Sequence, residues 1–271
     1  MPSANDRSHS TEIAERITRT ISEGLTATLV TLIRAEANVG AKLLVEENGQ
    51  VCGSLGSDQL TEPVKTRAAA FIDSHADMLV RDVKEFAPEL VDFAGAQLLF
   101  ERIQREPRLV ICGAGHVGAA LAKLASLLGY QSTLIDDRQE FVVRELFPDP
   151  RIELVAAADW ADAVRGSVSD GRGVSVVLVT RGHSEDEVCL QAVMATGADY
   201  VGMIGSKRRT RIVLERLREA GADEEMLGKV HAPIGLDIGA VTPEEVALAI
   251  MAEIVAVRRG GEGGSLSKLG G

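Results

Sequence analysis

The sequence predicts a two-part α/β protein, in which a doubly wound parallel sheet follows a smaller α+β domain. Strand and helix patterns alternate regularly after residue 107, as in repeated β-α units. The strand patterns LVIC, STLI and VSVVLVT are unbroken apolar runs, which are typical of parallel strands buried on both faces. A glycine-rich turn at residues 113–118 joins the first of these strands to a helix. Together these observations predict a Rossmann-like C-terminal domain.

The first 104 residues have the pattern of a small α+β domain. Asn48-Gly49 lies between two strand-like runs and predicts a hairpin, because both residues tolerate positive φ. Residues 1–10 are expected to be disordered, and the domain is expected to cover residues 11–104. Besides the hairpin, its expected elements are a helix over residues 11–23, a strand over 26–33, a helix over 59–74, and strands over 77–83 and 96–103.

A polar, proline-containing connector, Gln104 to Pro107, predicts the domain boundary. The second domain is expected over residues 105–258, and the glycine-rich residues 259–271 are expected to form a flexible tail. Thr242, Pro243 and Glu245 predict the capped start of its last helix. The other expected elements are strands over residues 109–112, 131–136, 151–156, 174–180 and 199–204, and helices over 116–128, 185–196 and 207–220.

Composition and charge exclude several classes of function. The formal net charge of −11 argues against nucleic acid as a partner, because its phosphates would be repelled. No apolar run approaches the roughly 18 residues of a membrane span, and the N-terminus has no apolar signal-peptide core, so a cytoplasmic protein is expected. Cys52, Cys112 and Cys189 form no CxxC pair, which argues against a disulfide framework and a structural zinc site.

Gly113, Gly115 and Gly118 form a GxGxxG turn between a predicted strand and a predicted helix. The first glycine makes the tight turn, the second lets the backbone approach a phosphate, and the third lets the helix pack closely. The helix N-terminus supplies free N–H donors and the positive end of a dipole. The sequence therefore predicts a phosphate site here, with a tight turn that binds nothing as the alternative.

Acidic and imidazole side chains flank this turn. Asp136 or Asp137, at the end of the next strand, can accept hydrogen bonds from ribose hydroxyls or another diol. His116 lies inside the turn, where a neutral imidazole facing the ligand and a solvent-facing side chain are equally compatible with the sequence.

The next two strand ends should meet the same edge of the sheet. At the first, Ser184 and Glu187 resemble a capping box, which leaves His183 and Asp186 as candidate ligand contacts or structural residues. At the second, Gly205 and Ser206 open a helix that carries the cations of the SKRRTR run. This start predicts a second anion site, with a solvated basic helix face as the alternative.

Five blocks in order resemble the XdhC/CoxI family, whose members are accessory proteins for xanthine and carbon monoxide dehydrogenases. The blocks are GAGHVGAALAKLASLLGY, IDDR, VTRGHSEDEV, YVGMIGSKRR and PIGLDIGAVTPEEVALAIMAEI. The resemblance implies a protein that binds molybdenum cofactor, assists its sulfuration and delivers it to an apo-molybdoenzyme, with a cysteine desulfurase as a further partner. The candidate cofactor-binding residues are Gly113, Gly115, His116, Val117, Gly118, Asp136, Asp137, Arg138, Arg181, His183, Asp186, Gly205, Ser206, Lys207 and Arg208.

The N-terminal half resembles the family less closely. GAKLLVEENGQVCGSLGSDQLTEPV is similar to its first domain, but Gln59 stands where the family carries cysteine, and Ser57 and Asp58 replace two glycines. A paralogue that binds a pterin or nucleotide without sulfur chemistry is therefore an alternative.

No nucleophile elbow, Walker lysine or metal-spaced His/Cys set occurs in the sequence, so it assigns no catalytic residue and no metal ligand. The first hypothesis is a cofactor carrier without turnover of its own. The second is an NAD(P)-dependent oxidoreductase, based on the glycine turn and Asp136, and the third is an interaction module that has lost its ligand. A homodimer is expected only because symmetric dimers are common.

Overall fold

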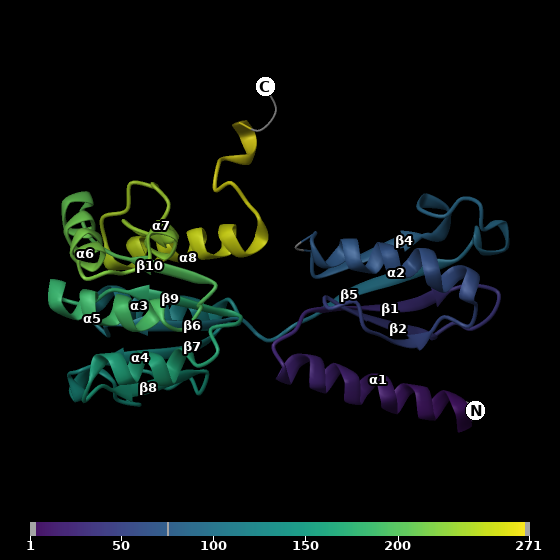
Figure 1. Cartoon of the computed structure of the whole chain (residues 1–271), viewed down its shortest axis with the longest axis horizontal. Coiled ribbons are helices and arrows are strands. Elements are labelled where there is room, and N and C mark those ends of the chain that lie inside the picture. The colour runs from purple at the N-terminus through teal and green to yellow at the C-terminus, as the bar shows by residue number, and fades with distance from the viewer. Residues whose placement is uncertain (1–3, 75, 269–271) are drawn as a thin grey trace. The chain divides into compact units, whose positions relative to one another are not determined.

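The computed structural model describes residues 4–74 and 76–268. The chain forms two compact units that divide between Arg105 and Glu106, inside the predicted connector. Each unit contains one sheet, and the two are coloured purple to blue and teal to yellow in Figure 1. The predicted fold class, a parallel α/β sheet preceded by a smaller α+β domain, is confirmed.

The N-terminal unit is built on a five-stranded antiparallel sheet of order β3-β2-β1-β5-β4. The predicted hairpin is confirmed, and Gly49 at its turn has a φ of +83°. The elements of this unit are α1 (Ala4–Ser22), β1 (Ala27–Arg34), β2 (Lys42–Glu46), β3 (Val51–Ser54), α2 (Asp58–Ile72), β4 (Met78–Asp82), η1 (Val83–Glu85), η2 (Val91–Phe93) and β5 (Gln97–Ile103).

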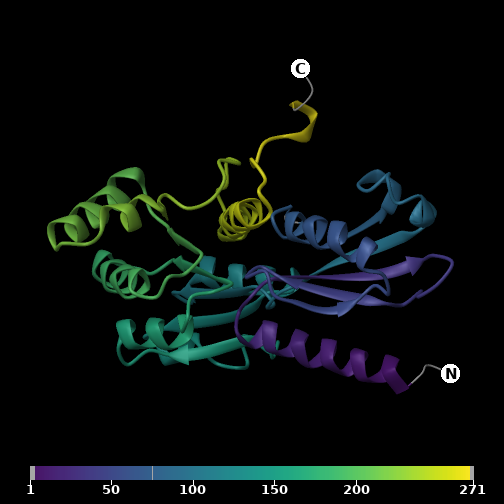
Figure 2. The same cartoon turned by 45° about the vertical axis from the view of Figure 1, so that its right-hand side comes forward.

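Helices α1 and α2 lie on opposite faces of this sheet in both views (Figures 1 and 2). Alternation along β1 explains the arrangement, because successive side chains of a strand point to opposite faces. Val30 and Leu32 join the core that α2 covers, which also contains Phe100, and Leu29 joins Ile13 of α1 on the other face.

A buried ion pair fixes α1 to the sheet. Arg16 donates to both carboxylate oxygens of Glu46, over 2.7 and 2.5 Å, and Thr20 Oγ1 donates to Glu46 Oε1 over 2.6 Å. Chiefly because of the bond from Arg16, the pKa of the Glu46 carboxyl is lowered.

Helix α1 begins at Ala4, so residues 4–10, which were expected to be disordered, are helical, and residues 1–3 lie outside the described part. Residues 4–10 show no apolar periodicity in the sequence, and they continue a helix whose later residues, such as Ile13, pack against the sheet.

The C-terminal unit is built on a six-stranded parallel sheet of order β11-β10-β9-β6-β7-β8. The chain starts at β6, moves outward through β7 to β8, and then returns to β9 on the other side of β6. Its elements are β6 (Arg108–Cys112), α3 (His116–Leu127), β7 (Gln131–Asp136), η3 (Gln139–Phe141), β8 (Ile152–Ala156), α4 (Trp160–Val168), β9 (Val174–Leu178), α5 (His183–Met194), β10 (Tyr200–Met203), α6 (Lys207–Glu219), α7 (Glu224–Gly228), β11 (Val230–His231), α8 (Pro243–Arg259) and η4 (Leu266–Lys268).

Two hydrophobic cores cover the two faces of this sheet. Helices α3 and α8 pack against one face and against each other, with Leu121 and Ile250 fully buried between them. Helices α4, α5 and α6 cover the other face, where Val164, Leu190 and Val213 are fully buried. This arrangement explains why the central strands read as continuous apolar runs.

One helix start differs from the sequence prediction. Helix α5 begins at His183 with Gly182 as its N-cap, so the capping box expected for Ser184 and Glu187 was wrong. Ser184 already lies in the first turn, and the carboxylate of Glu187 faces Arg216, 3.5 Å away on α6. The capping box of α8 is confirmed, because Thr242 and Glu245 exchange both bonds.

None of the helices in residues 4–74 and 76–268 combines the length and the apolar character needed to cross a membrane.

Truncation of Phe100 tests the N-terminal core. Phe100 is 1% exposed and lies 5.9 Å from Phe71, centroid to centroid. We expect Phe100→Ala to cost about 3–5 kcal/mol, because it removes a buried ring and leaves a cavity. Hydrogen exchange should show protection of the β1 and β5 amides falling by a factor of about 100 or more. Val91→Ala, at a side chain 77% exposed, is the control and should leave protection unchanged; equal effects would place Phe100 outside the core.

Candidate functional site

The turn between β6 and α3 brings two backbones into close contact. Gly113 has a φ of +114°, and a Cβ at this position would lie 2.5 Å from the carbonyl oxygen of Val179. A Cβ at Gly118 would overlap the carbonyl oxygen of Gly113. Packing within the protein therefore requires the first and third glycines of the motif.

Gly115, the second glycine, has a different environment. It is the N-cap of α3 with a φ of −65°, and a Cβ there would meet no atom within 4 Å. No side chain caps α3, so the N–H groups of its first turn have no partner from a preceding turn. The space above Gly115 is therefore open, and the donors and the helix dipole that border it favour an anion.

The two side chains that follow Gly115 point to different surroundings. His116 is exposed to solvent, whereas Val117 is half-buried and packs against the core beneath α3. Val117 therefore contributes to the position of the helix, and His116 is the side chain of this turn that a ligand can reach.

Asp136, the acid predicted beside the turn, is 1% exposed, and protein donors occupy both of its oxygens. Oδ1 accepts from the Arg138 N–H (3.0 Å) and Nε (2.8 Å), and Oδ2 accepts from the Ala114 N–H (2.7 Å) and Arg138 Nη2 (2.9 Å). Burial opposes ionisation of this carboxyl, but these bonds outweigh it and lower its pKa to about 2. In this conformation Asp136 holds the glycine turn against the end of β7.

Asp137 and Arg181 form an ion pair on the surface of the same edge. Arg181 Nη2 lies 3.0 and 3.1 Å from the two carboxylate oxygens of Asp137. Asp137 follows β7, and Arg181 lies three residues beyond the end of β9. Strand β6 lies between β7 and β9. The ion pair therefore spans the C-terminal end of β6, where the glycine turn begins.

Asp186, a second predicted contact, is fully buried beneath the start of α5. It accepts a bond from Thr180 Oγ1 (2.5 Å), and Arg209 pairs with its other oxygen through Nε (3.1 Å) and Nη2. Burial raises the pKa of this carboxyl despite those bonds. Asp186 therefore joins α5 to α6 in this structure, while the neighbouring His183 is exposed to solvent.

The second predicted anion site, at the start of α6, is partly occupied by the protein. Gly205 has a φ of +152°, and Ser206 Oγ caps the helix by accepting the Arg209 N–H over 3.2 Å. Lys207 and Arg208 are exposed, and neither makes an ion pair within the described part of the chain.

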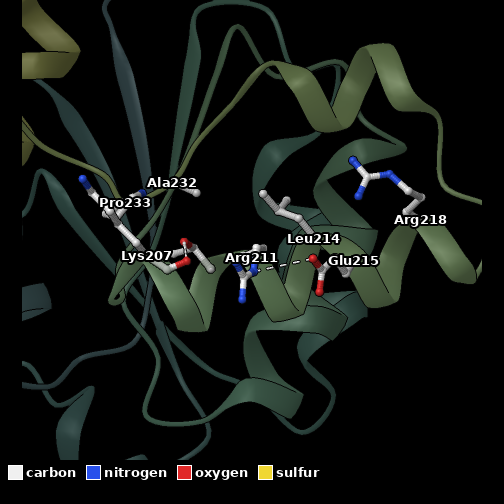
Figure 3. Close-up of a pocket in the computed structure, with 8 residues that line it drawn as sticks. Lys207, Arg211, Leu214, Glu215, Arg218, Ala232 and Pro233 are labelled. Carbon is white, nitrogen blue, oxygen red and sulfur yellow. Dashed lines mark hydrogen bonds and ion pairs between the residues drawn. The ribbon is translucent and has the colours of Figure 1, made fainter.

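A cavity of about 330 Å³ runs along α6 (Figure 3). It lies at the β10–β11 end of the sheet, whereas the glycine turn follows β6, two strands further along. Its charges are largely paired, because Arg211 and Arg218 face Glu215 and Glu224. The lining residues are Lys207, Thr210, Arg211, Leu214, Glu215, Arg218, Ala232 and Pro233.

A buried polar cluster around Glu253 was not foreseen from the sequence. Its carboxylate accepts bonds from Tyr200 Oη and the Gly235 N–H, each over 2.7 Å, and its Oε1 also lies 2.7 Å from Nδ1 of His231. Burial and the nearby carboxylate raise the pKa of the Tyr200 hydroxyl. These bonds and the Ile234 N–H to Met203 carbonyl bond (3.0 Å) fix the loop after β11 against β10 and α8. A lone carboxylate in the apolar sequence ALAIMAEI was the available signal.

Across residues 4–74 and 76–268, no three His, Cys, Asp or Glu side chains come close enough together to hold a metal ion. Cys112 and Cys189 are buried and unbridged, and burial raises the pKa of the half-buried Cys52 thiol.

Comparison with known families gives a match over most of both units. Residues 109–254, more than half of the chain, match the XdhC Rossmann domain, and residues 20–82 match the XdhC and CoxI family. The chain belongs to the XdhC/CoxI family. The resemblance inferred from the five sequence blocks is therefore confirmed.

Two curated relatives of this XdhC/CoxI chain carry functional names. A protein of Bacillus subtilis, named as a probable subunit of xanthine dehydrogenase, is 27% identical over 60% of this chain and 46% of its own length. The molybdenum cofactor insertion chaperone PaoD of Escherichia coli is 27% identical over 56% of this chain and 40% of its own. The chain spans less than half the length of the curated relatives it matches.

A solved structure shares the fold. The crystal structure of a Bacillus halodurans protein, described as a xanthine dehydrogenase, superposes with a TM-score of 0.66 at 22% identity and covers 92% of this chain and 67% of that chain. At this identity the similarity establishes the architecture alone.

The two kinds of glycine should respond differently to the same substitution. We expect Gly118→Ala to destabilise the C-terminal unit by about 2–4 kcal/mol, because the new methyl group overlaps the Gly113 carbonyl. Gly115→Ala should stay within about 0.5 kcal/mol of the parent, because its φ and its surroundings admit a methyl group. Urea unfolding measures both, and equal losses would contradict the distinction.

Asp136→Asn tests the bonds that hold the turn. We expect a loss of about 2–4 kcal/mol at pH 7, because Arg138 loses a buried anionic partner. A carboxyl whose folded-state pKa is lowered stabilises the fold above its unfolded pKa, near 4, and loses that effect as the pH falls towards 2. The stability gap between parent and variant should therefore shrink by about 1 kcal/mol from pH 5 to pH 3. A gap independent of pH would show that the charge of Asp136 is not what stabilises the turn.

Proposed function

We propose that this chain is an accessory factor that binds molybdenum cofactor and delivers it to a molybdoenzyme of the xanthine or carbon monoxide dehydrogenase type. Membership of the XdhC/CoxI family and the name of PaoD, a molybdenum cofactor insertion chaperone, support an accessory role in maturation. The observation that carries the proposal is the open, uncapped start of α3 beside Gly115.

The donor set at this edge fits the phosphate arm of such a cargo. The first-turn N–H groups of α3 would bind phosphate oxygens, and Arg181 supplies an exposed cation beside them. His116 and His183 are exposed on the adjoining helix starts and would border the same ligand. The cofactor is a cargo here, so the site has to bind and release it without reacting with it.

The N-terminal unit offers little for sulfur transfer. Gln59, at the family's cysteine position, is an exposed residue in the first turn of α2 and has no thiol. Burial raises the pKa of Cys52, which disfavours the reactive thiolate. Sulfuration, a cysteine desulfurase partner and a homodimer therefore stay predictions from the sequence, and the proposal is limited to binding and delivery.

The alternative of an NAD(P)-dependent oxidoreductase has less support. It requires an acid free to accept hydrogen bonds from ribose hydroxyls. The four protein donors on Asp136 occupy that acid, and a ribose would have to displace Arg138 or a backbone N–H.

Retention of isolated molybdenum cofactor tests the proposal directly. We expect the parent chain, incubated anaerobically and desalted, to keep molybdenum and pterin in stoichiometric amounts, with or without excess NAD. Gly115→Leu should lower retention by at least about tenfold, because its side chain fills the space where the phosphate would lie. Gly166→Leu is the matched control: Gly166 is exposed on α4, and a Cβ there also meets nothing within 4 Å.

Three outcomes would contradict the proposal. Absence of metal and pterin in the parent fraction would exclude a carrier of this cofactor. Displacement of the pterin by NAD would favour the oxidoreductase. Equal retention of the cofactor by Gly115→Leu and Gly166→Leu would show that the cofactor does not bind at the glycine turn.

A further inference from the structure

The ion pair between Asp137 and Arg181 lies beside the proposed phosphate site for a topological reason. Strands β9 and β7 flank β6 in register, with Cys112 opposite both Leu178 and Ile135. The segment after β9 then passes so close to the turn that the Val179 carbonyl limits the space at Gly113. Arg181 comes two residues later and reaches across to Asp137.

The two arginines beside the glycine turn, Arg138 and Arg181, differ in their freedom to move. Arg138 is 22% exposed, makes three bonds to Asp136 and lies over the Phe141 ring, 3.6 Å from its centroid. Arg181 is 54% exposed and pairs with Asp137 through one nitrogen, and within the described part of the chain it has no second partner. Of these two arginines, Arg181 is therefore the one that can change partners without breaking a buried network.

We propose that Arg181 binds the phosphate of the ligand by giving up its ion pair with Asp137. The inference rests on the proposed function in one respect, namely that the cargo reaches this edge with a phosphate group. In the free protein the Arg181 guanidinium is paired with the Asp137 carboxylate. In the bound protein the phosphate takes that place, bonded to Arg181 and to the first-turn N–H groups of α3, and Asp137 turns to solvent.

The strengths of the two pairings favour this exchange. An exposed ion pair contributes little, because water screens it and two side chains lose freedom. A phosphate beside a helix N-terminus can accept two bonds from one guanidinium in a site that already favours negative charge. Asp137, 36% exposed in the ion pair, can be hydrated once it is released. The acid thus lowers the affinity for the ligand by competing for the arginine and by repelling the phosphate.

Four single variants of the full chain test the exchange, with inorganic pyrophosphate as the probe in calorimetric titrations at fixed ionic strength. We expect Arg181→Gln to weaken pyrophosphate binding by about 10- to 100-fold, the effect of one charge-assisted contact. Asp137→Asn should strengthen it by about 3- to 10-fold, because the competing carboxylate is gone. The controls are Arg165→Gln and Asp162→Asn, which split another exposed ion pair (2.6 Å) in α4 with the same changes in net charge.

The outcomes separate this inference from the proposed function. If Arg181→Gln binds pyrophosphate as well as Arg165→Gln does, Arg181 does not contact phosphate and the inference is wrong. If Asp137→Asn binds no better than Asp162→Asn, or binds worse than the parent, Asp137 positions the arginine rather than competing for it, and the exchange is again wrong. If pyrophosphate follows the expected order but the parent retains no molybdenum cofactor, the exchange stands and the proposed cargo fails.

Discussion

The close contact between the Gly113 and Gly118 backbones is the constraint on which the candidate site depends. It leaves no room for a Cβ at Gly118, and the same turn holds the Val179 carbonyl against Gly113. Main-chain bonds continue to both neighbouring strands, from Gly113 N–H to the Ile135 carbonyl and from Val179 N–H to the Cys112 carbonyl, 2.8 Å each. The start of α3 is thereby fixed at the centre of the sheet edge, with its free N–H groups facing outward.

Charge at this edge is balanced in local pairs. The chain has a net charge of −11, yet each of three aspartates here has an arginine partner: Asp136 with Arg138, Asp137 with Arg181, and Asp186 with Arg209. Two of these carboxylates are buried and hold the turn and the α5–α6 contact in place. The third is exposed. An anion therefore meets three aspartates that are each paired with an arginine, and one of these arginines, Arg181, is exposed.

Sequence predicted the parallel sheet and the position of the glycine turn, because apolar runs and glycine spacing depend on local geometry. It predicted less about the side chains around the turn. The spacing placed Asp136 beside the turn but could not show that Ala114 and Arg138 occupy its oxygens. The helix start at Gly182 was missed because Ser184 and Glu187 match a capping pattern, while the partner of Glu187 is Arg216, far along the chain. Contacts of this kind come from the tertiary fold, and short motifs do not encode them.

A carrier has to bind its cargo and also release it, and an exchangeable ion pair suits both requirements. When a ligand leaves Arg181, the guanidinium regains Asp137 rather than being left with water alone, so part of the lost interaction is recovered. A buried pair such as Asp186 with Arg209 could not act in this way, because separating it would leave an uncompensated buried charge. The difference in exposure between these pairs therefore corresponds to a difference in role: the buried pairs maintain the architecture of the edge, and in the proposed exchange the exposed pair would set how tightly the edge binds phosphate.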